Sequence, residues 1–320
     1  MLSLESREQN FWIAVSGKAF RYCANAGYGA CNWLIPSEAP AGHTLCSACG
    51  LNRTIPDLTI PENLERWKRL EAAKHRLVYS LQRLRLPMKN GHDQPGGLLF
   101  DLLAGYAEDG QEKSVTTGHE DGVITIDVLE GDPAVRTERR QQLGERFRTL
   151  LGHFRHETGH YYLPQLTSSV GLDSFRELFG DETTDYGAAL EIHYREGPKP
   201  DWNQHYVTAY ASSHPHEDWA ETFAHYIHIV DTLDTAHAYG IGLRSETDRN
   251  AALEVDVDSY SEQNFDRLWD LWVPLTVAVN SLNRSMGHDD LYPFVLPSVA
   301  IDKLRFAHRC IRESGRSMDV

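Results

Sequence analysis

Two histidines and a glutamate have the types and the spacing of a metal-dependent hydrolytic site. The segment reads His156-Glu157-Thr-Gly-His160, so the two histidines stand four residues apart. On a helix, residues four apart share a face, and both imidazoles can then bind one metal ion. Glu157 is turned by about 100° around the helix axis, where its carboxylate can accept a proton from a metal-bound water. The spacing therefore predicts a zinc site with Glu157 as general base.

A zinc ion that catalyses hydrolysis keeps three protein ligands and one open position, so a third ligand is required. The extension H-E-x-x-H-x-x-G-x-x-H is absent, because Leu166 stands where its third histidine would be. The best candidate segment is HPHEDWAETFAH at 214–225, in which Glu217 and Glu221 share a helical face. One of them can bind the ion while the other holds a ligand histidine. The spacing leaves both assignments open, and it also fits an ordinary acidic first turn.

Four of the five cysteines form a second candidate metal site within the first 50 residues. They are Cys23, Cys31, Cys46 and Cys49, with the spacing C-x7-C-x14-C-x2-C. The last two cysteines and Gly50 make a knuckle that can grip one ion, and the first two complete a tetrahedral set. Four reduced thiols in a loop are the alternative, and His43 could serve as a substitute ligand. Because few apolar residues surround the cysteines, we expect a structural zinc ion to replace a hydrophobic core.

Composition limits the class of protein. Hydrophobic residues make up 41% and charged residues 24%, as in a folded globular chain of about two domains. A net charge of −15 argues against general binding of nucleic acids. No run approaches the roughly 18 apolar residues of a membrane span, and the N-terminus lacks the pattern of a signal peptide. We expect a cytoplasmic protein without membrane association, whose reducing surroundings favour metal-bound thiolates over disulfides, with Cys310 in the core.

The hydrophobic pattern predicts the elements that must position these residues. Apolar residues at helical spacing predict a helix that begins at Pro61 and ends before Pro87. Residues 61–90 hold eight Lys or Arg residues against three Glu residues, so this helix is basic. Strands are expected at 98–103 and 122–129, the second rich in β-branched residues. Helices are expected at 134–143, 146–164, 172–179, 184–195, 216–238, 262–284 and 297–313.

This order of elements predicts an α+β protein in three parts. The parts are a loop-rich module with the four cysteines over residues 1–58, a basic linking helix over 59–90, and a catalytic domain over 91–320. The module and the basic helix could recruit a protein partner, or they could simply pack against the catalytic domain with their charges in solvent.

The sequence resembles bacterial zinc-binding metallopeptidases that carry an N-terminal zinc-ribbon-like domain. The resemblance extends over nearly the whole chain and is carried by CNWLIP at 31–36, LCSACGLNRTIPDL at 45–58, TGHEDGVITI at 117–126, RTLLGHFRHETGHYY at 148–162, HPHEDWAETFAHY at 214–226 and NRSMGHDDLYPF at 283–294. It implies a zincin-like domain, in which a short twisted sheet lies against the HExxH helix and a second helix supplies a glutamate.

A narrower resemblance concerns the spacing Tyr210-x6-Glu217-x3-Glu221, which is similar to the active-site helix of anthrax lethal factor. It covers only this segment and the HExxH motif. It implies that Glu217 is a zinc ligand and that Glu221 supports a ligand. It also implies that Tyr210 donates a hydrogen bond to the oxyanion of the reaction. The residues alone also allow Tyr210 to be a packing residue.

Together these features predict a zinc metallopeptidase with one catalytic and one structural zinc ion, acting on a protein or peptide. Zinc on His156, His160 and Glu217 would lower the pKa of its water to about 7. Glu157 would take the proton and pass it to the leaving amine. The substrate would extend along an edge strand, for which 122–129 is the candidate. A zinc amidase and a non-catalytic zinc-binding protein are the alternatives.

Overall fold

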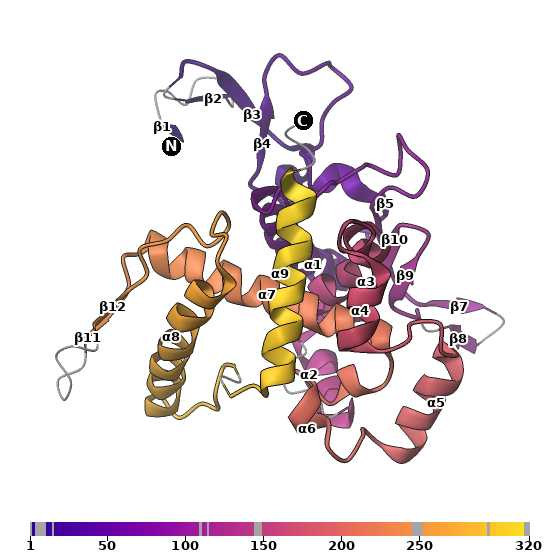
Figure 1. Cartoon of the computed structure of the whole chain (residues 1–320). Coiled ribbons are helices and arrows are strands. Elements are labelled where there is room, and N and C mark those ends of the chain that lie inside the picture. The colour runs from indigo at the N-terminus through magenta and orange to yellow at the C-terminus, as the bar shows by residue number, and fades with distance from the viewer. Residues whose placement is uncertain are drawn as a thin grey trace. The chain divides into compact units, whose positions relative to one another are not determined.

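The computed structural model describes residues 2–3, 11–14, 16–108, 111–113, 115–143, 149–244, 252–292 and 295–316 (Figure 1). Its contacts divide the chain into two compact units. The first comprises Met1–Tyr79 and Met88–Leu143, and the second comprises Ser80–Pro87 and Gly144–Val320. Both helices and small sheets are present, which confirms the α+β prediction. The boundaries expected after residues 58 and 90 come from sequence pattern and stay a prediction.

The first unit begins with a small antiparallel sheet of strand order β1-β2-β3-β4. The strands are β1 (Leu2–Ser3), β2 (Phe11–Ala14), β3 (Ala19–Tyr22) and β4 (Leu34–Pro36). We predicted a loop-rich module here and named no strands, because strands of two to four residues are too short to show an alternating hydrophobic pattern. Two short 3-10 helices, η1 (Ala24–Tyr28) and η2 (Cys49–Leu51), adjoin the cysteines.

A second sheet in the same unit has the order β5-β6-β10-β9. Its strands are β5 (Asn52–Thr54), β6 (Leu99–Leu103), β9 (Gly118–Glu120) and β10 (Val123–Asp127). The strands predicted at 98–103 and 122–129 are therefore present. However, β10 pairs with β6 on one side and with β9 on the other, so the prediction that 122–129 is an edge strand is wrong. The chain leaves β10 at Asp127, whose carboxylate accepts the Leu129 N–H and starts η3 (Val128–Gly131).

Helix α1 (Pro61–Arg83) contributes residues to both units. Its apolar face is buried as the spacing predicts, and Trp67, Leu70 and Leu77 have no exposed surface. The helix ends four residues before Pro87, where Arg85 adopts a left-handed φ of 55°. The first unit also contains the hairpin β7 (Tyr106–Glu108) with β8 (Gln111–Lys113) and the helix α2 (Pro133–Leu143).

The second unit is mainly helical. Its elements are α3 (Leu150–Val170), α4 (Leu172–Phe179), α5 (Tyr186–Glu196), α6 (Trp202–His205), η4 (Tyr210–Ser212), α7 (Pro215–Ala238), the hairpin β11 (Gly242–Arg244) with β12 (Ala252–Glu254), α8 (Phe265–Ser285) and α9 (Ser298–Arg316). The predicted helices after residue 149 are all present, whereas α6 was not expected. The predicted end of α3 at residue 164 is wrong, because this helix continues past Pro164 to Val170, and the burial of Leu166 stabilises the added turns. The predicted start at residue 146 lies outside the described residues.

Helix α7 is the centre of this unit and packs against α3, α8 and α9. Between Glu217 and Asp231 it is buried on nearly all sides. Trp219 meets Phe175 and Phe179 of α4 and Phe306 of α9 in one aromatic cluster. This packing fixes α7 relative to α3, which matters for the site described below.

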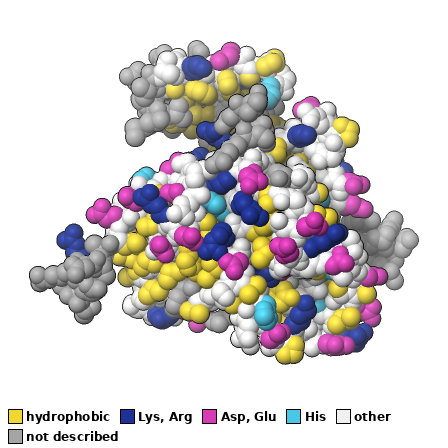
Figure 2. All heavy atoms as spheres, in the orientation of Figure 1, with side chains coloured by type: hydrophobic (Ala, Val, Ile, Leu, Met, Phe, Trp, Pro, Cys, Tyr) yellow, Lys and Arg dark blue, Asp and Glu magenta, His cyan; other side chains and the backbone are white. Residues whose placement is uncertain are grey.

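The surface shows no segregation of charge on the face drawn in Figure 2, where basic and acidic side chains of the described residues are interspersed. Apolar side chains gather over the region of α8, where Val277, Leu282 and Met286 are exposed. None of the described helices combines the length and apolar character that crossing a bilayer requires.

Candidate metal centres

Helix α3 carries the histidines and begins with a capped first turn. The Thr149 hydroxyl accepts the N–H of Gly152 at 2.9 Å, so the helix starts at Leu150. His153, His156 and Glu157 then follow at helical spacing on one side, with His160 one turn further on. Phe154 on another side is fully buried, and it anchors the helix in the unit.

A close helix crossing brings α7 to this face of α3. Gly159 lies against Ala220, and a Cβ atom on Gly159 would stand only 2.9 Å from the Ala220 Cα. Trp219 Nε1 donates to the Gly159 carbonyl oxygen at 2.9 Å across the same crossing. The glycine inside the HExxH motif therefore permits a helix spacing that a side chain would prevent.

The start of α7 places its glutamates. Pro215 occupies the first turn, and His214 caps the helix by accepting the His216 N–H through Nδ1 at 3.1 Å. The other ring nitrogen of His214 lies 3.0 Å from the Thr184 hydroxyl. Glu217 thus falls in the first turn of α7, and Glu221 follows one turn later.

Three side chains from the two helices converge on one point. His156 Nε2 lies 2.9 Å from Glu217 Oε2 and 3.2 Å from His160 Nε2, and His160 Nε2 lies 3.5 Å from Glu217 Oε1. One ligand atom from each residue lies within 4.8 Å of the other two. His156 and Glu217 are buried, with exposed fractions of 8% and 1%. The structure therefore brings together the three residues expected to hold the catalytic ion.

Glu221 contacts this group through His156. Its Oε1 lies 2.6 Å from His156 Nδ1, and its Oε2 accepts the Thr208 hydroxyl at 2.7 Å. A carboxylate on Nδ1 fixes the imidazole so that Nε2 faces Glu217 and His160. This arrangement fits Glu217 as the binding glutamate and Glu221 as the one that holds a histidine.

The converging atoms fit a cation. Glu217 Oε2 is buried and lacks a hydrogen-bond partner among the described residues, although His156 Nε2 is close. Electron-pair donors this close in a buried site repel one another unless a positive charge lies between them. Burial lowers the pKa of His156, but Glu217 and Glu221 outweigh it and raise that pKa well above its usual value. Burial raises the pKa of Glu217, but the imidazoles outweigh it and lower that pKa well below its usual range. Two imidazoles and a carboxylate are a donor set that suits zinc.

Glu157 lies beside the three-residue group and not within it. Its Oε1 is 3.3 Å from His153 Nε2, one turn earlier on α3. Burial alone would raise the pKa of Glu157, but hydrogen bonding to His153 and the nearby imidazoles lower it to about 2. The carboxylate therefore stays charged and able to accept a proton.

Two tyrosines approach the same group. The Tyr210 ring in η4 lies 5.9 Å from the His156 ring, and burial with the nearby Glu217 charge raises the pKa of its phenol. Tyr186 of α5 donates to Glu217 Oε1 at 2.6 Å. Sequence reasoning missed Tyr186 and Thr208, because no local spacing connects either residue with the HExxH helix.

The four N-terminal cysteines come together in the first unit. Their sulfur atoms all lie within 4.8 Å of one another, and Cys31 Sγ is 3.7 Å from Cys46 Sγ. Backbone N–H groups donate to two of the sulfurs. The Cys46 nitrogen lies 3.3 Å from Cys23 Sγ, and the Cys49 nitrogen lies 3.4 Å from Cys46 Sγ. Such donors favour thiolates, and four thiolates suit a tetrahedral ion. All five cysteines of the chain are free, and Cys310 is fully buried in α9 as predicted.

His43, which could have been a substitute ligand, is exposed, and its carbonyl oxygen accepts a hydrogen bond from Arg21. His75 of α1 takes the place near the cysteines that His43 could have had. Its Nε2 lies 3.1 Å from Cys31 Sγ and 3.6 Å from Cys49 Sγ. No sequence signal points to this contact, because His75 stands in a helix well beyond the last of the four cysteines.

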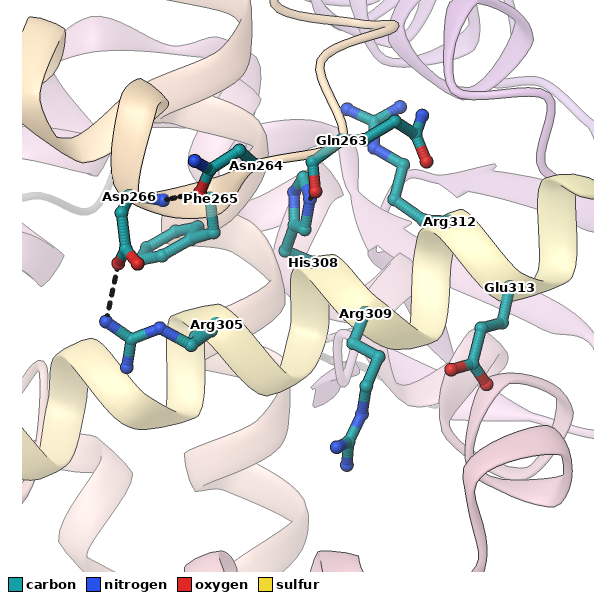
Figure 3. Close-up of a pocket in the computed structure, with 9 residues that line it drawn as sticks. All are labelled: Gln263, Asn264, Phe265, Asp266, Arg305, His308, Arg309, Arg312 and Glu313. Atoms are coloured by element: carbon teal, nitrogen blue, oxygen red, sulfur yellow. Dashed lines mark hydrogen bonds and ion pairs between the residues drawn. The ribbon is translucent and has the colours of Figure 1, made fainter.

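A separate hollow of about 310 Å³ lies between the start of α8 and helix α9 (Figure 3). Arg305 there pairs with Asp266 at 2.7 Å, and Arg312 donates to the Ser259 carbonyl oxygen at 3.0 Å. None of its lining residues belongs to either cluster described above. The chemistry predicted from the sequence therefore does not reside in this hollow.

Comparison with known proteins agrees with this geometry. A family model described as "Putative zinc-binding metallo-peptidase" matches residues 63–310, and a zinc-ribbon domain model matches residues 1–60. Uncharacterised proteins of Mycobacterium bovis and of two strains of Mycobacterium tuberculosis are each 47% identical over 294 residues, which cover 91% of this chain and 82% of each relative. No solved structure shows significant similarity. Because the first match spans more than half of the chain, the protein belongs to this zinc-binding metallo-peptidase family and carries an N-terminal zinc ribbon.

Proposed function

We propose that the protein is a zinc metallopeptidase whose catalytic ion is held by His156, His160 and Glu217. The observation that carries the proposal is the convergence of these three donors on one buried point, in a chain of a zinc-binding metallo-peptidase family. A bound zinc ion would polarise the peptide carbonyl and acidify a water molecule, the two contributions that this set of side chains cannot make alone.

Glu157 is the general base of the proposed reaction. Its carboxylate is buried and charged, and His153 holds it at 3.3 Å. It takes a proton from the attacking water and returns it to the leaving amine, so the carboxylate ends the cycle as it began. Because Glu157 stands outside the ligand group, it can do this without releasing the metal.

The neighbouring side chains orient this centre. Thr208 donates to Glu221, and Glu221 contacts His156, so the ring of His156 cannot rotate freely. Tyr210 stays protonated and can donate a hydrogen bond to the oxyanion that forms on the substrate. Tyr186 stabilises the charge of Glu217 through its hydrogen bond.

The same proposal gives the chain a second zinc ion, held by Cys23, Cys31, Cys46 and Cys49 with a structural role. Thiolates that cluster without a disulfide suit a reducing, cytoplasmic setting. The substrate is a protein or peptide. A zinc amidase that acts on small amides would use the same side chains, and a screen of denatured proteins against small amides separates the two activities.

The experiment that tests the proposal compares the wild-type protein with Glu157→Gln in the native host. New protein N-termini in the proteome should appear with the wild type and be absent with the variant, because the amide cannot accept a proton. Elemental analysis should show the same zinc content in both proteins. Identical sets of N-termini, with zinc retained in both, would contradict peptidase activity.

A further inference from the structure

His75 contacts the cysteine cluster from outside the zinc ribbon. The ribbon match ends at residue 60, whereas His75 lies in α1, within the segment that matches the metallo-peptidase family. Its Nε2 lies 3.1 Å from Cys31 Sγ, 3.7 Å from Cys46 Sγ and 3.6 Å from Cys49 Sγ. The imidazole therefore covers the face formed by three of the four sulfurs.

The orientation of this ring is fixed by the helix itself. His75 Nδ1 lies 2.6 Å from the carbonyl oxygen of Glu71, one turn earlier. A carbonyl oxygen can only accept, so Nδ1 is the donor in this bond, and in the imidazolium form Nε2 also carries a proton that it can donate to a thiolate. The ring cannot turn away without breaking the bond, and Nε2 is held toward the sulfurs. His75 is also buried, with an exposed fraction of 7%.

The charges around the ring support a role beside a metal centre. Four thiolates on a divalent cation carry an excess negative charge, which is costly to bury without a compensating donor. The Glu71 carboxylate and Lys74 ammonium are both fully buried and pair with each other at 2.9 Å. Asn52 also donates to Glu71, at 2.8 Å. Glu71 Oε2 also lies 3.7 Å from Cys49 Sγ, but it contacts that one sulfur alone. His75 is the polar group of α1 that meets three of the sulfurs.

We propose that His75 is a positioning residue that joins the cysteine-bound zinc to helix α1 by capping the face of Cys31, Cys46 and Cys49. Zinc binding in the ribbon and the order of α1 are then coupled through one side chain. The inference rests on the proposed structural zinc. It adds to that zinc a contact from the metallo-peptidase segment of the chain.

The distances from His75 Nε2 to the sulfurs also suit a competing role, in which His75 is itself a ligand and replaces Cys23. A tetrahedral zinc ion with nitrogen and sulfur ligands at about 2.05 and 2.3 Å spaces those atoms by about 3.6 Å. However, the Cys23 sulfur is close to the other three sulfurs and completes the tetrahedral set. The test must therefore count thiolate ligands as well as measure affinity.

The experiment uses the full-length protein loaded with Co²⁺, whose thiolate-to-metal absorption reports on the cysteine site alone. In His75→Ala, competition with a chelator should show Co²⁺ bound roughly 10–100-fold more weakly, as for other groups that orient ligands. The absorption per bound ion should still correspond to four thiolates. His43→Ala is the matched control, because His43 is exposed and should leave binding unchanged. His75→Gln keeps an N–H donor and should recover part of the loss.

Three results would overturn the inference. Equal Co²⁺ affinity in His75→Ala and the wild type would contradict the proposed role of His75 but not the proposed structural zinc. A wild-type spectrum of three thiolates and one nitrogen would make His75 a ligand. Absence of the thiolate absorption in the wild type would remove the structural zinc as well. If His75→Ala does not fold, nuclear magnetic resonance of the wild-type protein with ¹¹³Cd and ¹⁵N-histidine decides. A one-bond coupling between ¹¹³Cd and a His75 nitrogen contradicts the proposal. An Nε2–H signal without that coupling supports it.

Discussion

The two candidate metal centres are assembled in opposite ways. The cysteine site draws its sulfurs from residues 23–49, in loops and short 3-10 helices with little apolar core of their own. The His-His-Glu site joins residues of two long helices, and its contacting side chains lie up to 65 residues apart in sequence. In the first centre the proposed metal would hold the chain in place. In the second, a packed helix pair holds the side chains in place before a metal arrives, so loss of the ion should have different consequences at the two sites.

The largest expected effect is at the second centre. Glu217→Ala removes one of three ligands, so the protein should lose the catalytic zinc and all peptidase activity but keep the zinc of the cysteine site. Glu221→Ala, one turn along the same helix, is the matched control and should weaken zinc roughly 10–100-fold without abolishing binding. Zinc per chain, measured by elemental analysis, distinguishes them. If Glu221→Ala empties the site while Glu217→Ala only weakens it, the roles of the two glutamates are reversed.

The reciprocal change tests the first centre. Cys46→Ser together with Cys49→Ser should release the structural zinc and expose the region of residues 20–55 to proteolysis, because the metal substitutes for a core there. The zinc at His156 and His160 should remain. Limited proteolysis followed by mass spectrometry measures the local effect. An unchanged cleavage pattern near the cysteines would contradict a structural role for that ion.

A smaller effect is expected from the helix crossing. Gly159→Ala inserts a methyl group 2.9 Å from the Ala220 Cα, so α3 and α7 must move apart. We expect a loss of about 1–3 kcal/mol in the free energy of unfolding, as for other overpacked contacts, with weaker zinc binding at His156. The cysteine site should be unaffected. Denaturant unfolding with zinc analysis checks this, and a variant as stable as wild type would show that the crossing does not position the ligands.

The smallest effect separates the two tyrosines. Tyr210→Phe removes only the phenol oxygen, so zinc content and melting temperature should hold while turnover falls at least tenfold, about 1.4 kcal/mol. Tyr186→Phe loses the hydrogen bond to Glu217 and should instead weaken zinc binding with little change in turnover of the loaded protein. Steady-state kinetics at saturating zinc make the comparison. Unchanged turnover in Tyr210→Phe, or a fall in stability as large as the fall in turnover, would show that Tyr210 is a packing residue.

The same contrast explains how far the sequence alone could go. The HExxH helix and the cysteine knuckle are local patterns, and the helices of the second unit follow from the spacing of their apolar residues. Sequence spacing left Glu217 and Glu221 interchangeable, because both lie on one helical face. The structure separates their positions, because Glu217 meets Nε2 of His156 and Glu221 meets its Nδ1.

The features that sequence reasoning missed all depend on pairing between distant segments. The residues at 122–129 suit an edge strand and an inner strand equally well. Pairing with both β6 and β9 makes this strand an inner one. Tyr186 reaches Glu217 from another helix, and His75 reaches the cysteines from α1. The spacing of residues along the sequence does not encode such contacts, because they depend on how whole helices and strands pack together.

The central claim is that His156, His160 and Glu217 hold a zinc ion without help from the cysteines. The most direct measurement is zinc-edge X-ray absorption on the variant with Cys46→Ser and Cys49→Ser, in which that centre alone should retain zinc. The account predicts one zinc ion per chain, coordinated by nitrogen and oxygen with the signature of two imidazoles and without sulfur. A variant that binds no zinc, or zinc that still shows sulfur ligands, would contradict it.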